Sequence, residues 1–529
     1  MENPNFAENN PGINDYIKTN IKDKNSFVYR TGRVSFTLSE NFNFLRDAFS
    51  PDKNFDLIIR EFKIRIGEDF TDAFLVFYDG LTDQDEVNRD ILNPLMVGGL
   101  DRIPDDTDLE NIIYQCMLAQ GPNSKEREMQ KIIDFIGFGN TAIFVDGCSC
   151  AFVADVKGWG SRGVDRPVSE AVLTGPQEAF CEKVMTNIGL VRKILKDPNL
   201  IAEKVTVGAK SNTPCALMYI NGITNKNLVA EAKRRLSEIR LDYVFSSADI
   251  EMLIEDNTLF PLPQHLKTER PDRAAAQLSD GKVIIIVQGS PFALILPATA
   301  ADLIETAEDN YVRTAEANFM RFIRLIGCFL ALLLSGFFVA VMLYHHESIP
   351  TDLLFAIAAS REQMPFPLIL ELVIMILAFE LIKEASIRVP EPIGSTLGIV
   401  GGLILGQSAV SANIASPLLI IIVSIAALGA FAAPSTAISR AISVLQFFFI
   451  FLGGIAGFLG LALGLFALTA WLAQAHSFGV PYLSSSQNTD NPFFIFPMWK
   501  RELRPQNLKP QRAFKQPRIS RKWKESDNR

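Results

Sequence analysis

The feature that most constrains the fold of this chain is the run from Pro392 to Ser439, which contains no charged residue. The segment Leu325–Tyr344 is also uncharged, and a helix of about 20 apolar residues is long enough to cross the hydrocarbon core of a bilayer. Backbone polar groups that face lipid must bond within their own segment, so apolar runs of this kind form helices. We therefore expect an α-helical transmembrane bundle over residues 313–475.

Within this bundle, one apolar stretch differs from the others. The stretch 366–386 carries Glu371, Glu380 and Glu384, and charged side chains are costly in lipid. We therefore expect 366–386 to form an interfacial or re-entrant helix. The expected spans, the last of them long or tilted, lie at about residues 325–344, 393–410, 417–433 and 441–474.

The basic residues beside the bundle predict its orientation. Arg313, Arg321 and Arg324 precede the first span, and Lys500–Arg529 carries eleven basic and three acidic residues, a net charge of +8. Lys and Arg are retained on the cytoplasmic side of a membrane, so we expect cytoplasmic N and C termini, a basic cytoplasmic tail at 476–529 and an even number of crossings. Because the whole chain carries −8, the rest of it carries −16, which disfavours nucleic acid as a partner.

The region before the bundle has the pattern of a soluble α/β protein. Residues 1–25 are rich in Asn and Asp and predict a disordered lead-in without a signal peptide. We expect two α/β subdomains, at 26–138 and 139–312. The passages 141–156 and 282–297 each contain two apolar runs around a glycine turn, which predicts one hairpin in each of two neighbouring sheets.

Two helices are predicted between these hairpins. Apolar residues recur at helical spacing from Phe180 to Leu195, which indicates a helix with a buried stripe. A second helix is expected at 246–256, with Ser247 near its start and Ile250, Leu253 and Ile254 directed inward.

No pattern typical of an enzyme or a cofactor site is present. The chain has four histidines and neither a phosphate-binding glycine loop nor a nucleophile elbow. Cys148 and Cys150 would suit a metal, but no second Cys or His pair follows at a suitable spacing, which favours buried, inert thiols. His345-His346, at the end of the first span, is either a pH sensor or, as we favour, part of a solvated interface. We expect no catalytic, cofactor or metal site.

One short segment concentrates charge around a proline in the soluble region. It is either a ligand contact or, as we favour, a salt-bridged turn that packs a subdomain against its hairpin, because arginine fixes turns through bidentate pairs. The segment consists of Thr268, Glu269, Arg270, Pro271, Asp272 and Arg273.

The acidic residues of 366–386 are candidates for an ion pathway. Glu380 and Glu384 are one helical turn apart and share a face, whereas Glu371 points about half a turn away. Lys383 offers an internal partner, so a structural ion pair is the alternative.

Glycines spaced four residues apart predict close helix packing, within this chain or between copies in an oligomeric pore. They are Gly398, Gly402 and Gly406, and Gly453 and Gly457.

Several passages resemble the A subunit of the GerA-type spore germinant receptors, from about Asn41 to Pro505. The order and density of the matches carry this resemblance, and Thr268–Arg273 is the most specific of them. The other matches include Ile59–Phe62, Tyr78–Leu81, Gly158-Trp159, Gly289–Pro291, Pro365–Pro367, Pro392–Gly394, Gly406-Gln407 and Gly479–Leu483.

The resemblance implies a subunit of a nutrient germinant receptor in the spore inner membrane. It implies B-type transporter-like and C-type lipoprotein subunits as partners, together with the lipid membrane, and we expect a homo-oligomer that conducts ions. A SpoVAF-like amplifier of ion release and a non-conducting scaffold for the transporter-like partner are the alternatives.

Overall fold

The computed structural model describes residues 32–66, 69–98, 109–114, 123–158, 166–362, 364–388, 402, 404 and 406–483. The chain divides into two compact units. One unit is 1–164 with 183–204, and the other is 165–182 with 205–529. The expected lead-in at 1–25 lies outside the described residues.

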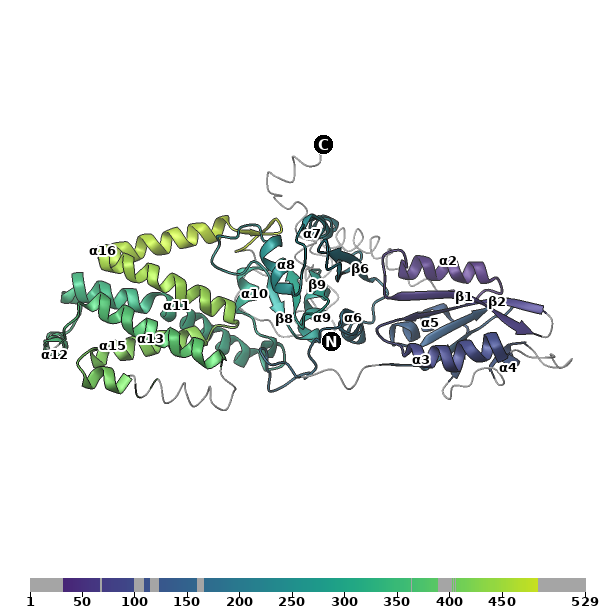
Figure 1. Cartoon of the computed structure of the whole chain (residues 1–529), viewed down its shortest axis with the longest axis horizontal. Helices are drawn as coiled ribbons and strands as arrows, with labels where there is room; N and C mark the ends of the chain where they lie inside the picture. The colour runs from purple at the N-terminus through teal and green to yellow at the C-terminus, as the bar shows by residue number, and fades with distance from the viewer. Residues whose placement is uncertain are drawn as a thin grey trace, which may run out of the picture. The chain divides into compact units, whose positions relative to one another are not determined.

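The first unit is built on a five-stranded antiparallel sheet with the strand order β1-β2-β4-β5-β3 (Figure 1). Its strands are β1 (Leu57–Ile66), β2 (Asp69–Tyr78), β3 (Asn123–Glu126), β4 (Thr141–Val145) and β5 (Ala151–Ala154). Its helices are α2 (Leu38–Phe49), α3 (Gln84–Glu86), η3 (Val87–Leu92), η4 (Pro94–Gly98), α4 (Leu109–Ile112), α5 (Met129–Gly137) and α6 (Val184–Ile194).

This sheet is covered on both faces, because its strands contribute side chains to two separate apolar clusters. One cluster contains residues of α2 and α5, such as Leu45 and Ile132. The other contains residues of η3 and η4, such as Ile91 and Leu95.

The expected subdomain boundary at 138/139 is wrong, because β4 and β5 continue the first sheet. Residues of β4 pair with β2, for example Phe144 with Phe74. The helix α6 also belongs to this unit. Its Arg192 donates a 2.5 Å hydrogen bond to Asp56, and both side chains are buried.

Another five-stranded sheet has the order β6-β7-β9-β10-β8 and belongs to the second unit from residue 205 onward. Its strands are β6 (Leu200–Val207), β7 (Thr213–Ile220), β8 (Leu266–Thr268), β9 (Val283–Val287) and β10 (Ala293–Leu296), and its helices are α7 (Lys226–Glu238), α8 (Ser247–Ile254), α9 (Pro271–Ser279), α10 (Ala300–Ile304) and η6 (Ala307–Asn310).

Both predicted hairpins are confirmed, one in each sheet. β4 pairs with β5 and β9 with β10, with positive φ at Gly147 and Gly289 in the turns. In the predicted helix at 246–256, Ser246 rather than Ser247 caps α8, through a capping box with Asp249. Leu253 is 48% exposed instead of buried.

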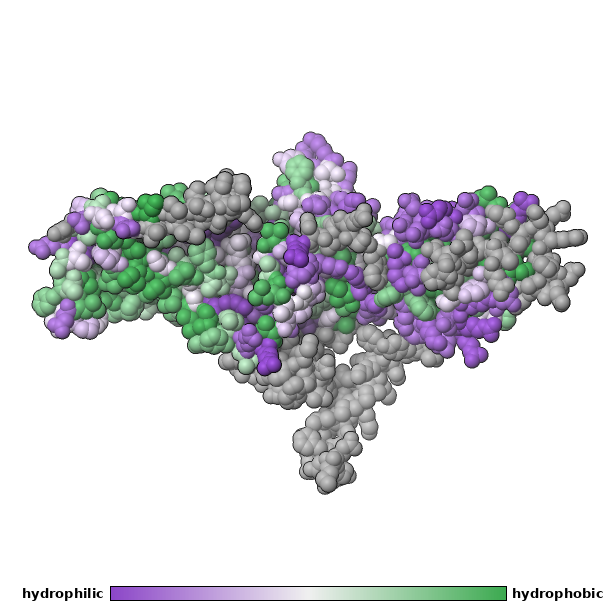
Figure 2. Space-filling model, turned by 90° about the horizontal axis from the view of Figure 1, so that it is seen from below, coloured by the Kyte–Doolittle hydropathy of each residue, from purple (hydrophilic) through white to green (hydrophobic). Residues whose placement is uncertain are grey.

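The C-terminal part of the second unit is a helical bundle whose described surface is largely apolar (Figure 2). Within the described residues, α11 and α16 are long and apolar enough to cross a membrane, and α15 is a shorter apolar helix. The elements are α11 (Thr314–Tyr344), η7 (His346–Ser348), α12 (Thr351–Arg361), α13 (Leu368–Arg388), a helical segment at 406–411, α15 (Pro417–Phe431) and α16 (Thr436–Gln474).

The helix α16 folds back on itself, so the expected single span at 441–474 is in fact two helices. Its 39 residues would be about 58 Å long as one helix, roughly twice the thickness of a hydrocarbon core. Gly457 has φ 58° and ψ −138°, which breaks the helix. A Cβ on Gly464 would lie 2.5 Å from Leu452 Cδ1, although twelve residues of straight helix span about 18 Å. Figure 1 shows the two arms.

Tyr344 stabilises this reversal from the end of α11. Its hydroxyl donates to the carbonyl oxygens of Gly454 and Ile455, at 2.8 and 2.9 Å. The ring of His345 stacks on Phe458 with the centroids 4.2 Å apart. The bend therefore lies at the same end of the bundle as the C-terminus of α11.

Close helix packing occurs at some of the predicted glycines and not at others. A Cβ on Gly453 would lie 2.5 Å from the carbonyl oxygen of Gly336. Among the described residues, a Cβ on Gly402 would meet nothing within 4 Å, and one on Gly406 only Ile420 at 4.0 Å. Gly457 forms the bend described above, and Gly398 lies outside the described residues.

A further close helix contact, which the sequence does not predict, joins α11 to α15. A Cβ on Gly429 would lie 2.3 Å from the carbonyl oxygen of Gly327. These two glycines are distant in sequence, so no four-residue repeat indicates that they are in contact.

We predict that Gly453→Ala destabilises the bundle, because the new methyl group must push α11 away from α16. Overpacking of this kind costs about 1–3 kcal/mol. The thermal unfolding midpoint of the purified protein in detergent should fall, and Gly402→Ala is the matched control. Equal midpoints for the two variants would show that the α11–α16 contact is not tight.

Candidate coupling site

The α/β part of the second unit, which carries the sheet β6-β7-β9-β10-β8, is called the second subdomain from here on. The first turns of α11 are joined to it by a cluster of buried charges, which we call the Asp309 cluster: Glu305, Asp309, Arg321 and Arg324. Arg324 donates to both carboxylate oxygens of Asp309, at 2.8 and 2.7 Å. Arg321 contacts Asp309 at 3.2 Å and Glu305 at 3.0 Å. Arg324 also donates to the carbonyl oxygen of Ile304.

The local sequence fixes the position of the Asp309 side chain. Thr306 and Asp309 form a capping box at the start of η6, so the Asp309 side chain also accepts hydrogen bonds from Thr306. Burial raises the pKa of Asp309, but hydrogen bonds from Arg324 and Thr306 and the charge of Arg321 outweigh it, so the pKa falls below its ordinary value of 3.8. The carboxylate is therefore charged at neutral pH, and its contribution to stability is lost only as the pH falls through that lowered pKa.

The segment Thr268–Arg273 links three parts of the second subdomain. Arg270 has a fully buried side chain that donates to Asp272 and to the carbonyl oxygens of Glu170 and Pro176. Arg273 pairs with Glu170 and donates to the carbonyl oxygen of Glu305 at 2.9 Å.

The remaining members have partners of the same kind. Glu269 accepts hydrogen bonds from Ser169 and from the backbone of Glu170, Thr268 bonds Glu170, and Asp272 bonds Tyr311. Pro271 is the first residue of α9. This arrangement favours the salt-bridged turn over the ligand contact. It also brings the turn next to the Asp309 cluster, through Glu305.

The end of α16 returns to the same subdomain through a short hairpin at 476–482, formed by β11 (His476–Ser477) and β12 (Val480–Pro481). We call it the C-terminal hairpin. Tyr482 is fully buried and its hydroxyl donates to Pro263 O at 2.9 Å. Ser477 donates to Gln264 O at 2.7 Å, and Phe478 N donates to Asp256 at 2.6 Å. The expected tail at 476–529 therefore begins with a docked segment; 484–529 lies outside the described residues.

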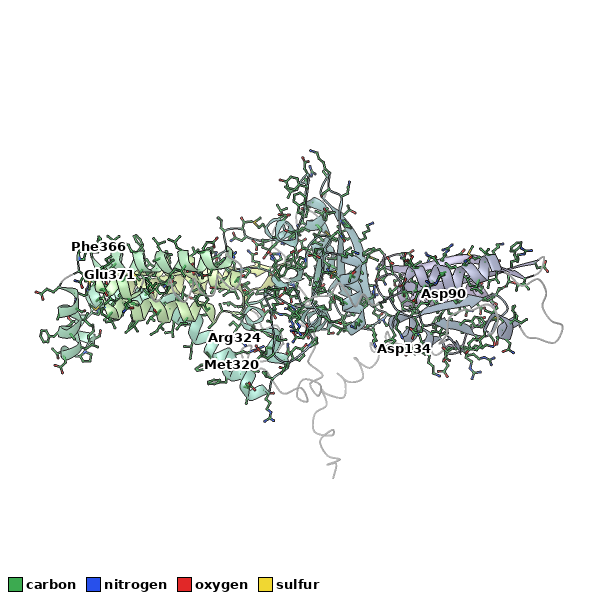
Figure 3. All side chains as sticks on the ribbon, turned by 60° about the horizontal axis from the view of Figure 1, so that its bottom comes forward. Asp90, Asp134, Met320, Arg324, Phe366 and Glu371 are labelled. Carbon is green, nitrogen blue, oxygen red and sulfur yellow. The ribbon has the colours of Figure 1, made fainter. Side chains whose placement is uncertain are left out.

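Glu371 lies at the opposite end of the helical region from Arg324 (Figure 3). It is 1% exposed and accepts a 2.6 Å hydrogen bond from the backbone N–H of Ser416, at the start of α15. Arg361 approaches its other oxygen only to 3.9 Å. The N-terminus of a helix favours a negative charge, so Glu371 holds α13 and α15 together.

Glu380 faces α16 instead. It accepts hydrogen bonds from Lys383 at 2.7 Å and from Ser443 at 2.8 Å. These residues line a small cavity of about 40 Å³, which Gln446 also reaches. Glu384 is exposed on the same helix. The three predicted carboxylates thus have three different surroundings, as the half-turn offset of Glu371 implies.

The acidic half of the Asp309 cluster and the docking of the C-terminal hairpin are not predicted from the sequence. As basic residues beside an apolar span, Arg321 and Arg324 indicate only the orientation of the bundle. The pattern Thr306-x-x-Asp309 before an apolar helix is a capping signal that could have revealed the acidic partner. No sequence pattern of this kind predicts the buried hydrogen bond that Gln446 donates to Ser335, at 2.7 Å.

The candidate metal ligands in the first unit have an ordinary structural setting. Cys148 and Cys150 are buried. Burial and the nearby carboxylate of Glu110 raise the pKa of Cys150 to about 12, so this thiol is protonated at neutral pH.

We predict that Asp309→Asn loosens the attachment of α11. The change leaves Arg324 without a charged partner and Arg321 with Glu305 alone, and removing one partner of a buried ion pair costs about 3–5 kcal/mol. The thermal unfolding midpoint in detergent should fall by several degrees. Glu308→Gln is the matched control, because Glu308 is adjacent and has no ion pair in the described structure. A midpoint unchanged in both variants would contradict the anchoring role.

Comparison with known proteins gives consistent matches over most of the chain. The family model described as "Bacillus/Clostridium GerA spore germination protein" matches residues 43–507. The chain is 38% identical to spore germination protein KA of Bacillus subtilis over 459 residues, covering 86% of this chain and 84% of the relative. It is 36% identical to spore germination protein GerLA of Bacillus cereus, covering 81% and 86%.

A solved structure also matches: the N-terminal domain of the A subunit of the Bacillus megaterium spore germinant receptor GerK3. The match has 28% identity, covers 50% of this chain and 96% of that domain, and gives a TM-score of 0.36. From the length and order of the sequence matches we conclude that this chain belongs to the GerA family of spore germination proteins.

Proposed function

We propose that this protein is the A-type subunit of a nutrient germinant receptor in the spore inner membrane, and that it couples germinant sensing to the release of cations. Its partners would be a B-type transporter-like subunit and a C-type lipoprotein subunit. The membership of the chain in the GerA family supports this role.

The observation that carries the coupling role is that both ends of the helical region are fastened to one subdomain. The Asp309 cluster holds the start of α11, and the C-terminal hairpin holds the end of α16. A displacement of the second subdomain would therefore move both helices. They pack on each other at Gly336 and Gly453, so the movement would reach the middle of the bundle.

We further propose that the chain crosses the membrane six times, with both termini in the cytoplasm. The reversal at Gly457 supplies two passes within α16. α13 is a continuous helix of 21 residues that packs among α11, α15 and α16, which supports a full crossing in place of the expected interfacial or re-entrant helix. The remaining passes are α11, α15 and the span expected near 393–410. The contact between Gly327, in the first half of α11, and Gly429, near the end of α15, supports this count, because it suits two helices that run in opposite directions.

The candidate ion pathway includes Glu371, Glu380 and Glu384, in an oligomer of this subunit. Glu380 is the strongest of them, because it lines a cavity between α13, α15 and α16 together with Lys383 and Ser443. Acidic side chains in a pore favour cations. A non-conducting scaffold remains the alternative from another class, and a SpoVAF-like amplifier of ion release is the alternative within the family.

The proposal is tested first by deleting the gene and measuring spore germination with a panel of single nutrients. Loss of the response to one nutrient class, restored by the wild-type gene, is the expected result. Normal responses to every nutrient would refute the receptor role. Potassium flux through the purified protein in liposomes separates the channel from the scaffold, which would conduct under no condition.

We predict that Glu380→Gln slows potassium release after nutrient addition while leaving the amount of protein in the spore unchanged. The amide oxygen of glutamine still accepts hydrogen bonds from Lys383 and Ser443, so the variant loses only the charge. Glu347→Gln is the control, because Glu347 is exposed in η7 and lies outside the proposed pathway. A fall in protein amount, with normal release per molecule, would instead assign Glu380 to a structural ion pair.

A further inference from the structure

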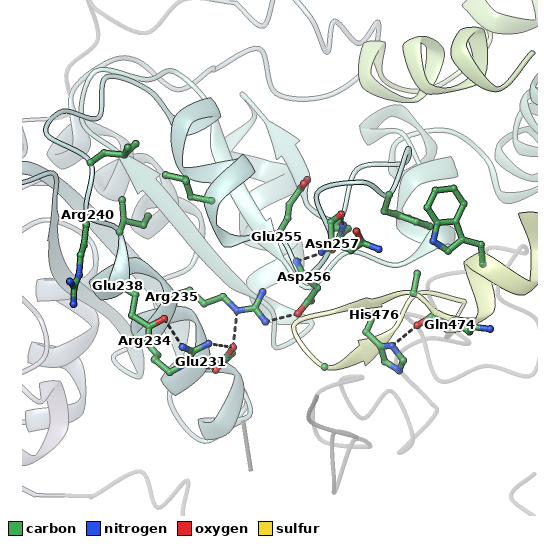
Figure 4. Close-up of a pocket in the computed structure, with 18 residues that line it drawn as sticks. Glu231, Arg234, Arg235, Glu238, Arg240, Glu255, Asp256, Asn257, Gln474 and His476 are labelled. Atoms are coloured by element: carbon green, nitrogen blue, oxygen red, sulfur yellow. Dashed lines mark hydrogen bonds and ion pairs between the residues drawn. The ribbon is translucent and has the colours of Figure 1, made fainter. Parts of the chain in front are cut away.

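The second unit contains a cavity of about 1030 Å³ beside the C-terminal hairpin (Figure 4). One wall is the end of α7 and the segment that follows α8. The other wall is the last turn of α16 with the first residues of the C-terminal hairpin. The residues that define the two walls include Glu255, Phe260, Trp471, Gln474 and His476. An occupant of this cavity would touch the soluble subdomain and a bundle helix together.

Most charges in this cavity are already paired. Arg235 donates to Glu231 at 2.7 Å, to Asp256 at 2.6 Å and to the carbonyl oxygen of Ile254. Arg234 bonds Glu231 and Glu238. Arg240 also lines the cavity, and it lies well apart from Glu255 in Figure 4.

The carboxylate of Glu255 accepts a backbone hydrogen bond from Gln264 but has no arginine or lysine partner among the described residues. Its side chain is 16% exposed, and the nearest basic atom among the described residues is Nδ1 of His265, at 3.8 Å. Burial, with the charge of Arg235, lowers the pKa of His265 to about 3, so His265 is neutral and does not balance the carboxylate. Glu251 and Asp256 lie close enough to add further negative charge. Lys267 is 3.7 Å from Glu251.

Aromatic side chains form the adjoining part of the cavity. Phe260 packs edge to face on Trp471, with the ring centroids 5.5 Å apart, and on Tyr482 at 5.2 Å. Trp471 remains 38% exposed. The face of an indole ring attracts cations, and organic ammonium groups most of all.

We propose that this cavity binds a small organic ammonium ion, with Glu255 as its counter-charge and Phe260 and Trp471 as its apolar contacts. The size of the cavity suits a small metabolite. Binding at this site does not require the bundle to conduct ions, so its test is independent of the tests of the proposed function.

The state of Glu255 makes the binding pH-dependent. Burial and the neighbouring acids raise its pKa to about 7, and a cation binds only the ionised form well. Affinity should therefore rise by about tenfold between pH 6 and pH 8. His476→Gln, which removes the imidazole that lines the cavity, should keep this dependence.

The experiment measures choline binding to the purified full-length protein by calorimetry, with 3,3-dimethyl-1-butanol as the neutral probe of the same shape. We expect choline to bind at least about tenfold more tightly than the alcohol, a difference of about 1.4 kcal/mol. Acetate, the probe of opposite charge, should not bind. Equal affinity for choline and the alcohol, or no binding of choline, would overturn the proposal.

Two variants assign the contact. Glu255→Gln should weaken choline binding at least about tenfold, whereas Glu238→Gln should not, because Glu238 lines the same cavity but is paired with Arg234 and 62% exposed. Equal loss in both variants would overturn the assignment to Glu255. Glu255→Gln could lower the unfolding midpoint and so lose binding through misfolding. In that case the pH dependence of the wild-type protein tests the role of Glu255. Trp471→Ala, which should also weaken choline binding, then tests the site.

Discussion

The attachment of an apolar helix bundle to a soluble sheet depends on the carboxylate of Asp309. A buried charge is costly unless other groups replace its water. Here two arginines of α11 and the capping hydrogen bonds of Thr306 do so. Because bidentate pairs also fix direction, the cluster determines where α11 begins relative to η6. The turn at Thr268–Arg273 supports it from the sheet, since Arg273 reaches the backbone of Glu305.

The helices themselves are held by a different kind of contact. Lipid offers apolar groups as good an environment as another helix does, so helices in a membrane associate by close approach and by polar bonds. Gly336 meets Gly453 and Gly327 meets Gly429, while Gln446 bonds Ser335 in the interior. Contacts of both kinds converge on α11. A bundle organised around one helix, itself fixed to the subdomain at its base, is suited to transmit movement.

The C-terminal hairpin is the second attachment of the helical region to the second subdomain. Polar groups of the subdomain are used to hold it. Asp256, Gln264 and Pro263 use side-chain or backbone atoms to hold it. The loop 255–264 therefore serves two neighbours, the C-terminal hairpin on one side and the cavity at Glu255 on the other. An occupant of the cavity would act on the same loop that fixes the end of α16.

The sequence by itself determined the soluble α/β region, the two hairpins, the apolar bundle and the family, because these depend on local periodicity, uncharged length and motifs. It also predicted that Arg270 belongs to a charged turn and that Glu380 is a candidate for the ion pathway. Only the tertiary structure decided their partners, the assignment of β4 and β5 to the first sheet, the reversal at Gly457 and the separate surroundings of Glu371 and Glu380. These depend on contacts between residues far apart in the chain, such as Gly327 with Gly429 or Tyr482 with Pro263. No local pattern encodes such pairings, since each glycine or carbonyl group looks the same whichever partner it meets.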